Sequence, residues 1–142
     1  MCLSVFWQQT RREYGRPTPS AGYLRQLSLL IEREMPRRKY YLEQGLTLDS
    51  LSRKLGTNRS YLSKVISKLT GCNFCTYINQ LRMEEIMLHY GDDAVESESA
   101  LYEAALQCGF NSRRTFNRVF LKEMGMLPCD FVVVYHFMKE KY

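Results

Sequence analysis

The chain has 142 residues, of which 45% are hydrophobic and 25% charged, the composition of an ordinary soluble globular protein. This length accommodates one domain or two small subdomains that share a core, and only eight glycines and four prolines favour helices over a turn-rich β fold. The net charge of +5 suits an anionic partner without identifying it, and every apolar run is shorter than the ~20 residues that span a bilayer.

The first 20 residues are polar and basic and end in the linker-like sequence RPTPS. We expect residues 1–20 to form a flexible tail or linker. The opening sequence MCLSVFW, followed by Arg11 and Arg12, leaves a second interpretation open. In that interpretation the chain is a fragment of a longer protein, and its start is the cytoplasmic end of a membrane helix with a positive flank.

Residues 21–40 predict an N-terminal amphipathic helix and a connector. We expect the helix to run from Ala21 to Met35 and to stop at Pro36. Its apolar positions at helical spacing are Leu24, Leu27, Leu30 and Ile31. Three residues of the connector are expected to dock on the core: Tyr40, Tyr41 and Leu42.

Residues 41–72 have the pattern of a helix-turn-helix unit. Thr47 can cap a short helix that Gly56 ends, and Asn58 can cap a second helix that Gly71 ends. The apolar positions of the short helix are Leu48, Leu51 and Leu55, and those of the second helix are Leu62, Val65, Ile66 and Leu69. A short helix, a tight glycine turn and a second helix with a polar outer face is the layout of a DNA reader.

Residues 73–90 predict a linking helix from Phe74 to Tyr90, roughly 25 Å long at about 1.5 Å per residue. One side of it is expected to carry Tyr77, Ile78, Leu81, Glu85 and Leu88. We expect Arg82 on this helix to be a structural ion-pair partner rather than a DNA ligand. The sequence GDDAVESES after the helix predicts a solvated acidic loop.

Residues 91–131 repeat the helix-turn-helix layout. A helix from Ala100 to Cys108 leads into a turn at Gly109, and a helix from Ser112 to Glu123 follows, with Asn111 or Ser112 as its cap. Phe110 is expected to be a buried plug, and the inward positions of the second helix are Phe116, Val119 and Phe120. A short last helix begins near Cys129. Residues 132–142 form a C-terminal extension, in which Val132 to Val134 is the one candidate strand.

The whole pattern predicts an all-α fold of about seven helices, with two helix-turn-helix subdomains joined by a long linking helix. Two acid-free clusters of basic residues mark the two subdomains and resemble phosphate-facing surfaces. The first cluster consists of Arg53, Lys54, Arg59, Lys64 and Lys68. The second consists of Arg113, Arg114, Arg118 and Lys122.

From about Tyr41 to Phe131 the chain resembles the DNA-binding domain of the AraC/XylS family of bacterial transcription regulators. In the second subdomain the resemblance rests on Gly109, Phe110, Ser112, Phe116, Arg118, Phe120, Gly125, Pro128 and Phe131. In the first subdomain it rests on Leu48, Leu51, Leu55, Asn58, Tyr61, Leu62, Ser63 and Ile66. On the linking helix it rests on Tyr77, Ile78, Leu81 and Arg82.

The resemblance implies a transcription regulator, expected to be an activator, that binds double-stranded DNA as a two-headed reader and contacts RNA polymerase. Fusion to an upstream sensor or membrane segment, which would make this the cytoplasmic part of a membrane-anchored regulator, stays open. Leu121 stands where the family usually has Lys, and Ile86 stands where a small residue is usual. The tail VVVYHFMKEKY is unusually apolar and continues past the family's usual end.

The predicted DNA contacts lie on the second helix of each subdomain or at its cap. In the first they are Asn58, Arg59, Ser60, Tyr61, Ser63 and Lys64. In the second they are Asn111, Ser112, Arg113, Arg114, Thr115, Asn117 and Arg118. Arginine suits guanine, asparagine suits adenine, and hydroxyl or lysine side chains suit phosphates. For Asn58 and Asn111, capping is as strong an interpretation as base readout.

We expect no catalytic residues, metal or cofactor. His89 and His136 are isolated from any catalytic or metal-binding spacing. The five cysteines are interpreted as inert thiols in a reducing cytoplasm, and the pair Cys72 and Cys75 has no flanking His or second such pair that would favour zinc. The alternative function is a protein-interaction adaptor that uses the same helical fold and basic faces on an acidic partner.

Overall fold

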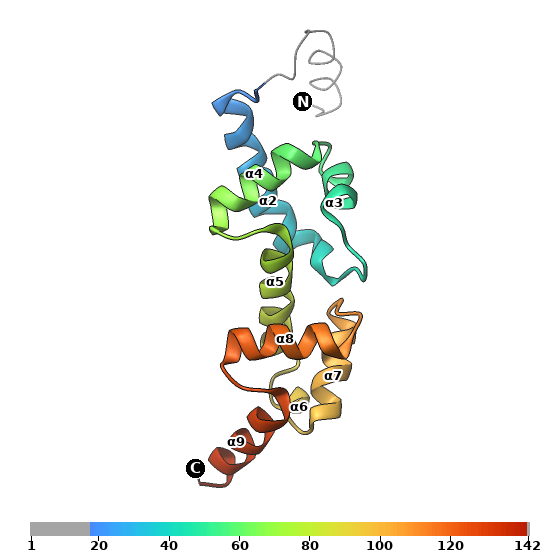
Figure 1. Cartoon of the computed structure of the whole chain (residues 1–142), viewed down its shortest axis with the longest axis vertical. Coiled ribbons are helices and arrows are strands. Elements are labelled where there is room, and N and C mark those ends of the chain that lie inside the picture. The colour runs from blue at the N-terminus through green and yellow to red at the C-terminus, as the bar shows by residue number, and fades with distance from the viewer. Residues whose placement is uncertain (1–17, 142) are drawn as a thin grey trace. The chain divides into compact units, whose positions relative to one another are not determined.

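The computed structural model describes residues 18–141, and within this range every regular element is a helix. Seven α-helices have seven or more residues: α2 (Ala21–Arg38), α3 (Leu48–Lys54), α4 (Arg59–Thr70), α5 (Phe74–His89), α7 (Glu98–Gln107), α8 (Arg113–Met124) and α9 (Pro128–Lys141) (Figure 1). The 3-10 helix η1 (Tyr40–Leu42) and the four-residue helix α6 (Gly91–Ala94) are the short elements of this range. The all-α prediction is confirmed, whereas the hypotheses about MCLSVFW fall outside the described residues.

The chain forms two compact units. Among the described residues, the first unit contains 18–38 and 47–74, and the second contains 39–46 and 75–141. The predicted boundary placed residues 41–46 in the first subdomain, whereas they pack with the second. The reason is a set of bonds to α5, in which Arg82 donates from Nε to the carbonyl of Tyr41 at 2.7 Å and from Nη2 to the carbonyl of Glu43 at 3.0 Å.

In the first unit, α2 and α3 each pack against α4. Its fully or nearly buried apolar side chains are Leu27, Ile31, Met35, Leu51, Leu55, Leu62, Val65 and Ile66. The hydroxyl of Tyr23 on α2 lies 2.8 Å from that of Thr57, which precedes α4. Helix α2 therefore closes the core of the helix-turn-helix formed by α3 and α4.

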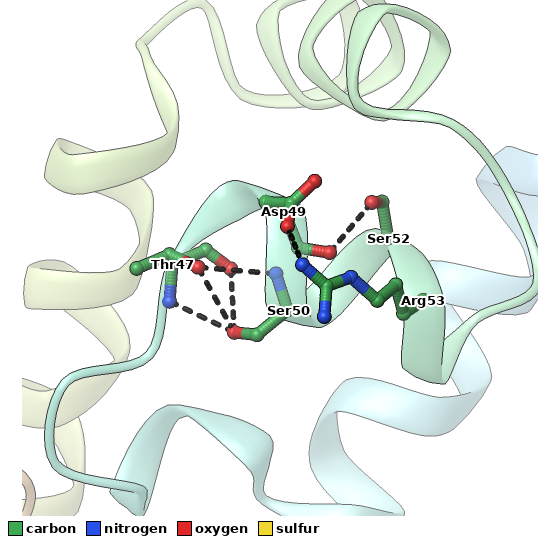
Figure 2. A network of polar contacts seen from close by, with 5 residues as sticks. All are labelled: Thr47, Asp49, Ser50, Ser52 and Arg53. Atoms are coloured by element: carbon green, nitrogen blue, oxygen red, sulfur yellow. Dashed lines mark hydrogen bonds and ion pairs between the residues drawn. The ribbon is translucent and has the colours of Figure 1, made fainter.

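The short helix α3 begins in a capping box (Figure 2). The Thr47 side chain accepts from the Ser50 N–H at 3.0 Å, and the Ser50 hydroxyl accepts from the Thr47 N–H at 3.0 Å. Asp49 and Arg53 form an ion pair one turn apart, and the Ser52 hydroxyl donates to the Asp49 carbonyl. Because a helix of seven residues is marginal alone, these bonds and its packing on α4 account for its formation. The predicted cap at Thr47 is confirmed.

In the second unit, α7, α8 and α9 pack around a chain of phenylalanine rings. Phe116 lies edge-on to Phe110 at 5.4 Å and to Phe120 at 5.5 Å, measured between ring centres. Phe120 is in turn edge-on to Phe131 of α9 at 5.3 Å. This is the preferred geometry for aromatic pairs. Phe110, Phe116 and Phe120 are core residues, as the sequence predicts.

Two predicted helix ends were wrong. Helix α2 continues through Pro36 to Arg38, because a proline in the last turn removes only one helical bond, whose acceptor is the carbonyl of the exposed residue Glu32. Helix α9 has 14 residues rather than being short, and Val132 to Val134 are helical rather than a strand. Helix α9 packs against the second core through Phe131, Val132 and Tyr135, and this packing outweighs the weak strand preference of the three valines.

The predicted inner face of α5 was also wrong in part. The residues buried on α5 are Ile78, Arg82, Met83, Glu85 and Ile86, whereas Leu88 is 77% exposed. Two polar residues take inward positions because hydrogen-bond partners meet them there. The partners of Arg82 are main-chain carbonyls rather than the carboxylate of the predicted ion pair. In the acidic loop, Val95 is 2% exposed and belongs to the core, so that segment is not wholly solvated.

Candidate nucleic-acid interface

Helix α4 separates a buried apolar side from a polar and basic side. Its buried residues are Leu62, Val65 and Ile66. Its exposed residues include Arg59, Ser60, Ser63, Lys64, Ser67 and Lys68. The Asn58 carboxamide oxygen caps the helix by accepting from the Tyr61 N–H at 2.9 Å. Gly71 ends it with φ of 71°. One face of α4 is thus fixed by the core while the other offers donors to solvent.

Helix α8 has the same division in the second unit. Its buried residues are Phe116, Val119 and Phe120. The exposed basic residues are Arg113, Arg114, Arg118 and Lys122, and Thr115 and Asn117 are half-buried beside them. Ser112, and not Asn111, is the cap: its hydroxyl oxygen accepts from the Thr115 N–H at 3.1 Å. This resolves the alternative that the sequence left open.

Several of the predicted contact residues are held by contacts within their own unit. Asn58 and Ser112 use a side-chain oxygen in the caps, so each has less capacity left for a ligand. Tyr61 lies edge-on to Tyr23 of α2, with the ring centres 5.6 Å apart. Asn111 is exposed just before α8. In each unit the predicted DNA contacts therefore lie on one helix or at its start. The two cap residues, Asn58 and Ser112, serve to begin their helices.

Tyr102 on α7 helps to position the basic side of α8, and the sequence did not reveal this role. The guanidinium carbon of Arg113 lies 4.7 Å from the centre of the Tyr102 ring, which is the geometry of a cation–π contact. The two residues are eleven positions apart and lie on different helices, so neither spacing nor periodicity connects them. This contact orients Arg113 at the first turn of α8.

Leu121, the departure from the family pattern noted in the sequence, lies on the exposed side of α8. It stands on α8 between Phe120 and Lys122 and is 46% exposed, at the position where a lysine was expected. An exposed leucine cannot donate to a phosphate. The basic side of α8 is therefore carried by its three arginines and Lys122.

The described residues contain no group of three or more His, Cys, Asp or Glu side chains suited to a metal ion. Burial raises the pKa of Cys108 to about 11, so this thiol is unreactive at neutral pH. Within residues 18–141, no helix has the length and apolarity needed to cross a membrane.

Comparisons with known proteins agree with this geometry. A family model described as a helix-turn-helix domain matches residues 51–132. The chain is 26% identical over 88 residues to the probable transcription factor PqrA of Proteus vulgaris, covering 62% of this chain and 69% of that protein. It is 28% identical over 91 residues to the regulatory protein SoxS of Salmonella typhimurium, and these residues cover 64% of this chain and 81% of that protein.

A third relative is the right origin-binding protein of Escherichia coli, 28% identical over 108 residues, which are 76% of this chain and 34% of that protein. Among solved structures, the fold is similar to the C-terminal domain of AraT, a response regulator from Geobacillus stearothermophilus. The TM-score is 0.58 and the identity 24%, and the match covers 84% of this chain and 88% of that chain. Because the family model covers more than half of its length, the chain belongs to the AraC-type helix-turn-helix family of DNA-binding transcription regulators.

Proposed function

We propose that the protein regulates transcription by inserting α4 and α8 into successive major grooves of one double-stranded DNA site. The observation that carries this proposal is the repeated division of the second helix in each unit, with a capped start, a buried apolar face and an exposed basic face. Two readers on one chain suit grooves that recur about every 34 Å along one face of B-DNA.

For α8, we assign base readout to the middle of the exposed face. Arg114 and Arg118 are exposed and four residues apart, so they lie on one side of the helix. Each guanidinium can donate two bonds to O6 and N7 of guanine, and the half-buried Asn117 beside them suits adenine. Arg113, which the Tyr102 ring orients, is assigned to the groove edge or to a phosphate.

For α4, we assign Arg59 and Lys64 mainly to phosphates and Ser60 and Ser63 to the groove. All four side chains are exposed, and no acidic residue occurs between Arg53 and Gly71 to oppose a phosphate. Serine hydroxyls donate and accept, so they tolerate several bases and contribute less discrimination than arginine. We therefore expect α8 to dominate specificity and α4 to contribute more to overall affinity.

We further propose that the protein activates transcription through a contact with RNA polymerase. This part rests on membership of the AraC-type family and on the similarity to a protein named as a transcription factor and to one named as a regulatory protein. Transcription in vitro with purified polymerase tests it. Activation requires more transcript when the protein is bound upstream of a promoter, and less transcript would indicate repression.

The DNA-binding proposal is tested by selecting bound fragments from a random DNA pool and comparing the enriched sequence with random DNA in mobility shifts at moderate salt. Arg114→Ala is expected to weaken specific binding by about 1–3 kcal/mol and to relax the preference at one position. Lys122→Ala, at the last turn of the same helix, is the matched control, and it should weaken binding to the enriched sequence and to random DNA equally. If no fragment is preferred, the basic faces serve an acidic protein partner instead.

A further inference from the structure

Helix α9 carries apolar residues on two adjoining sides. One side, formed by Phe131, Val132 and Tyr135, packs against the core of the second unit. On the other side Val133, Val134, Phe137 and Met138 are 47–69% exposed. An apolar side of a helix is normally covered by another element. Figure 1 shows α9 running out from α7 and α8, so that its last turns stand away from that core.

The exposed side of α9 is a continuous stripe. It begins at Asp130, runs through the four apolar residues and ends at Lys141. These six positions follow the spacing i, i+3, i+4, i+7, i+8 and i+11, which keeps them on one helix face. The apolar part is thus bounded by an acid at one end and by Lys141 at the other, where the Lys141 Nζ lies 4.7 Å from the centre of the Phe137 ring. We call this surface the α9 stripe.

The stripe complements itself when two copies meet antiparallel. With a two-fold axis between Tyr135 and His136, Val134 faces Phe137 of the second copy and Val133 faces Met138. The same axis places Asp130 opposite Lys141 at both ends. Hydrophobic contacts in the centre and opposite charges at the edges are the features that fix register and direction in paired helices. One axis satisfies all three pairings, and such a contact closes as a symmetric dimer.

We propose that the α9 stripe is a docking surface for a second copy of this chain. The contact is small, because a helix of 14 residues is about 21 Å long and offers less than the roughly 800 Å² per partner of a standard stable interface. The dimer is therefore weak and concentration-dependent. It does not require DNA, so its test is made on the protein alone and is independent of the proposed function.

The experiment is sedimentation equilibrium of the full chain from about 10 μM to about 1 mM, a range that spans weak association. The mass should rise from one chain towards two. Phe137→Glu should weaken the dimer about tenfold or more, because it places a charge in the centre of the stripe. Leu88→Glu is the matched control, since Leu88 is an exposed leucine on α5 of the same unit and lies off the stripe. It should leave the association unchanged.

Charge exchange tests the register. Asp130→Lys or Lys141→Asp alone should weaken the dimer, and the double variant should restore it because the opposite charges meet again between copies. If these charges served only the dipole of their own helix, the double variant would be worse than either single one. A single-chain mass at every concentration, a dimer unaffected by Phe137→Glu, or failure of the double variant to restore association would each overturn the proposal. Circular dichroism confirms that each variant is folded.

Discussion

Residue 109 has no room for a side chain. Gly109 has φ of 97°, and a Cβ there would lie 2.8 Å from the Tyr41 carbonyl oxygen and 2.9 Å from that of Leu42. Neither oxygen can move freely, because both belong to the main chain of η1, which Arg82 holds to α5. This glycine is therefore what allows the turn between α7 and α8 to approach η1.

We predict that Gly109→Ala destabilises the second unit by about 2–5 kcal/mol, the sum of a left-handed alanine and a steric clash. The matched control is Gly125→Ala at the end of α8, where φ is 75° and nothing lies within 4 Å of the added carbon. It should cost only about 1–2 kcal/mol. Hydrogen exchange of the α7 and α8 amides measures both variants in the relevant unit. Equal losses would show that space is not the constraint at Gly109.

The Glu85 carboxylate gives the second unit an acid-sensitive contact. It accepts from Lys39 Nζ at 2.7 Å and from the Tyr41 hydroxyl at 2.9 Å. Burial alone would raise the pKa of Glu85, but these two hydrogen bonds and the charge of Lys39 lower it below its ordinary value of 4.5. Since the folded pKa is the lower one, the stabilisation is complete above pH 4.5 and is lost as the pH falls through the folded value.

We predict that Glu85→Gln costs about 1.5–3 kcal/mol at neutral pH, because it removes charged hydrogen bonds. The loss should shrink in acid, where the wild-type carboxyl is itself protonated. Unfolding in urea at a series of pH values between about 3 and 7 measures this. Glu84→Gln, an exposed neighbour on the same helix, should change stability by less than about 0.5 kcal/mol at neutral pH. If Glu85→Gln lowered the free energy of unfolding by the same amount at all pH values, the ionised Glu85 carboxylate would not be the source of the stabilisation.

At the scale of single elements, we predict that the start of α8 depends on its cap residue Ser112. Ser112→Ala should cost about 1 kcal/mol, because the Thr115 N–H loses its acceptor. Asn111→Ala, one residue earlier and exposed, should cost less than about 0.5 kcal/mol. Thermal unfolding of the two variants checks this order. The reverse order would mean that Asn111 provides the cap in solution.

The helices that carry the proposed contacts were the ones best predicted from the sequence. Helix α4 begins after Asn58 and ends at Gly71, and α8 begins after Ser112 and ends at Gly125. These ends were predictable because caps and left-handed glycines are local signals that act over three or four residues. The buried faces of both helices followed from periodicity for the same reason. In α4 only Leu69, which is 40% exposed, departed from the predicted inner face.

The elements that were poorly predicted depend on contacts distant in sequence. Arg82 turns inward on α5 because the carbonyls of Tyr41 and Glu43, some 40 residues earlier, accept its hydrogen bonds. The length of α9 and the burial of Val95 depend on packing against the second core. The orientation of Arg113 depends on Tyr102 of another helix. No local pattern contains these partners, so they required the folded structure.

At the scale of the whole molecule, we propose that one chain reads DNA with two helices. The two units are compact on their own, and each has its own capped helix with an exposed basic face. A two-headed reader makes phosphate contacts in two places, and its affinity should therefore fall steeply with salt. An adaptor for an acidic protein shares the charge but has no reason to contact two separate sets of bases.

The most direct measurement is base-by-base interference on the selected DNA site with wild-type protein and with variants of each helix. We predict two blocks of essential bases about 10 base pairs apart from centre to centre. The double variant Arg114→Ala and Arg118→Ala should erase one block, and Arg59→Ala with Lys64→Ala should weaken the other. A single block that disappears with the α8 variant, while the α4 variant has no effect, would contradict the two-headed account.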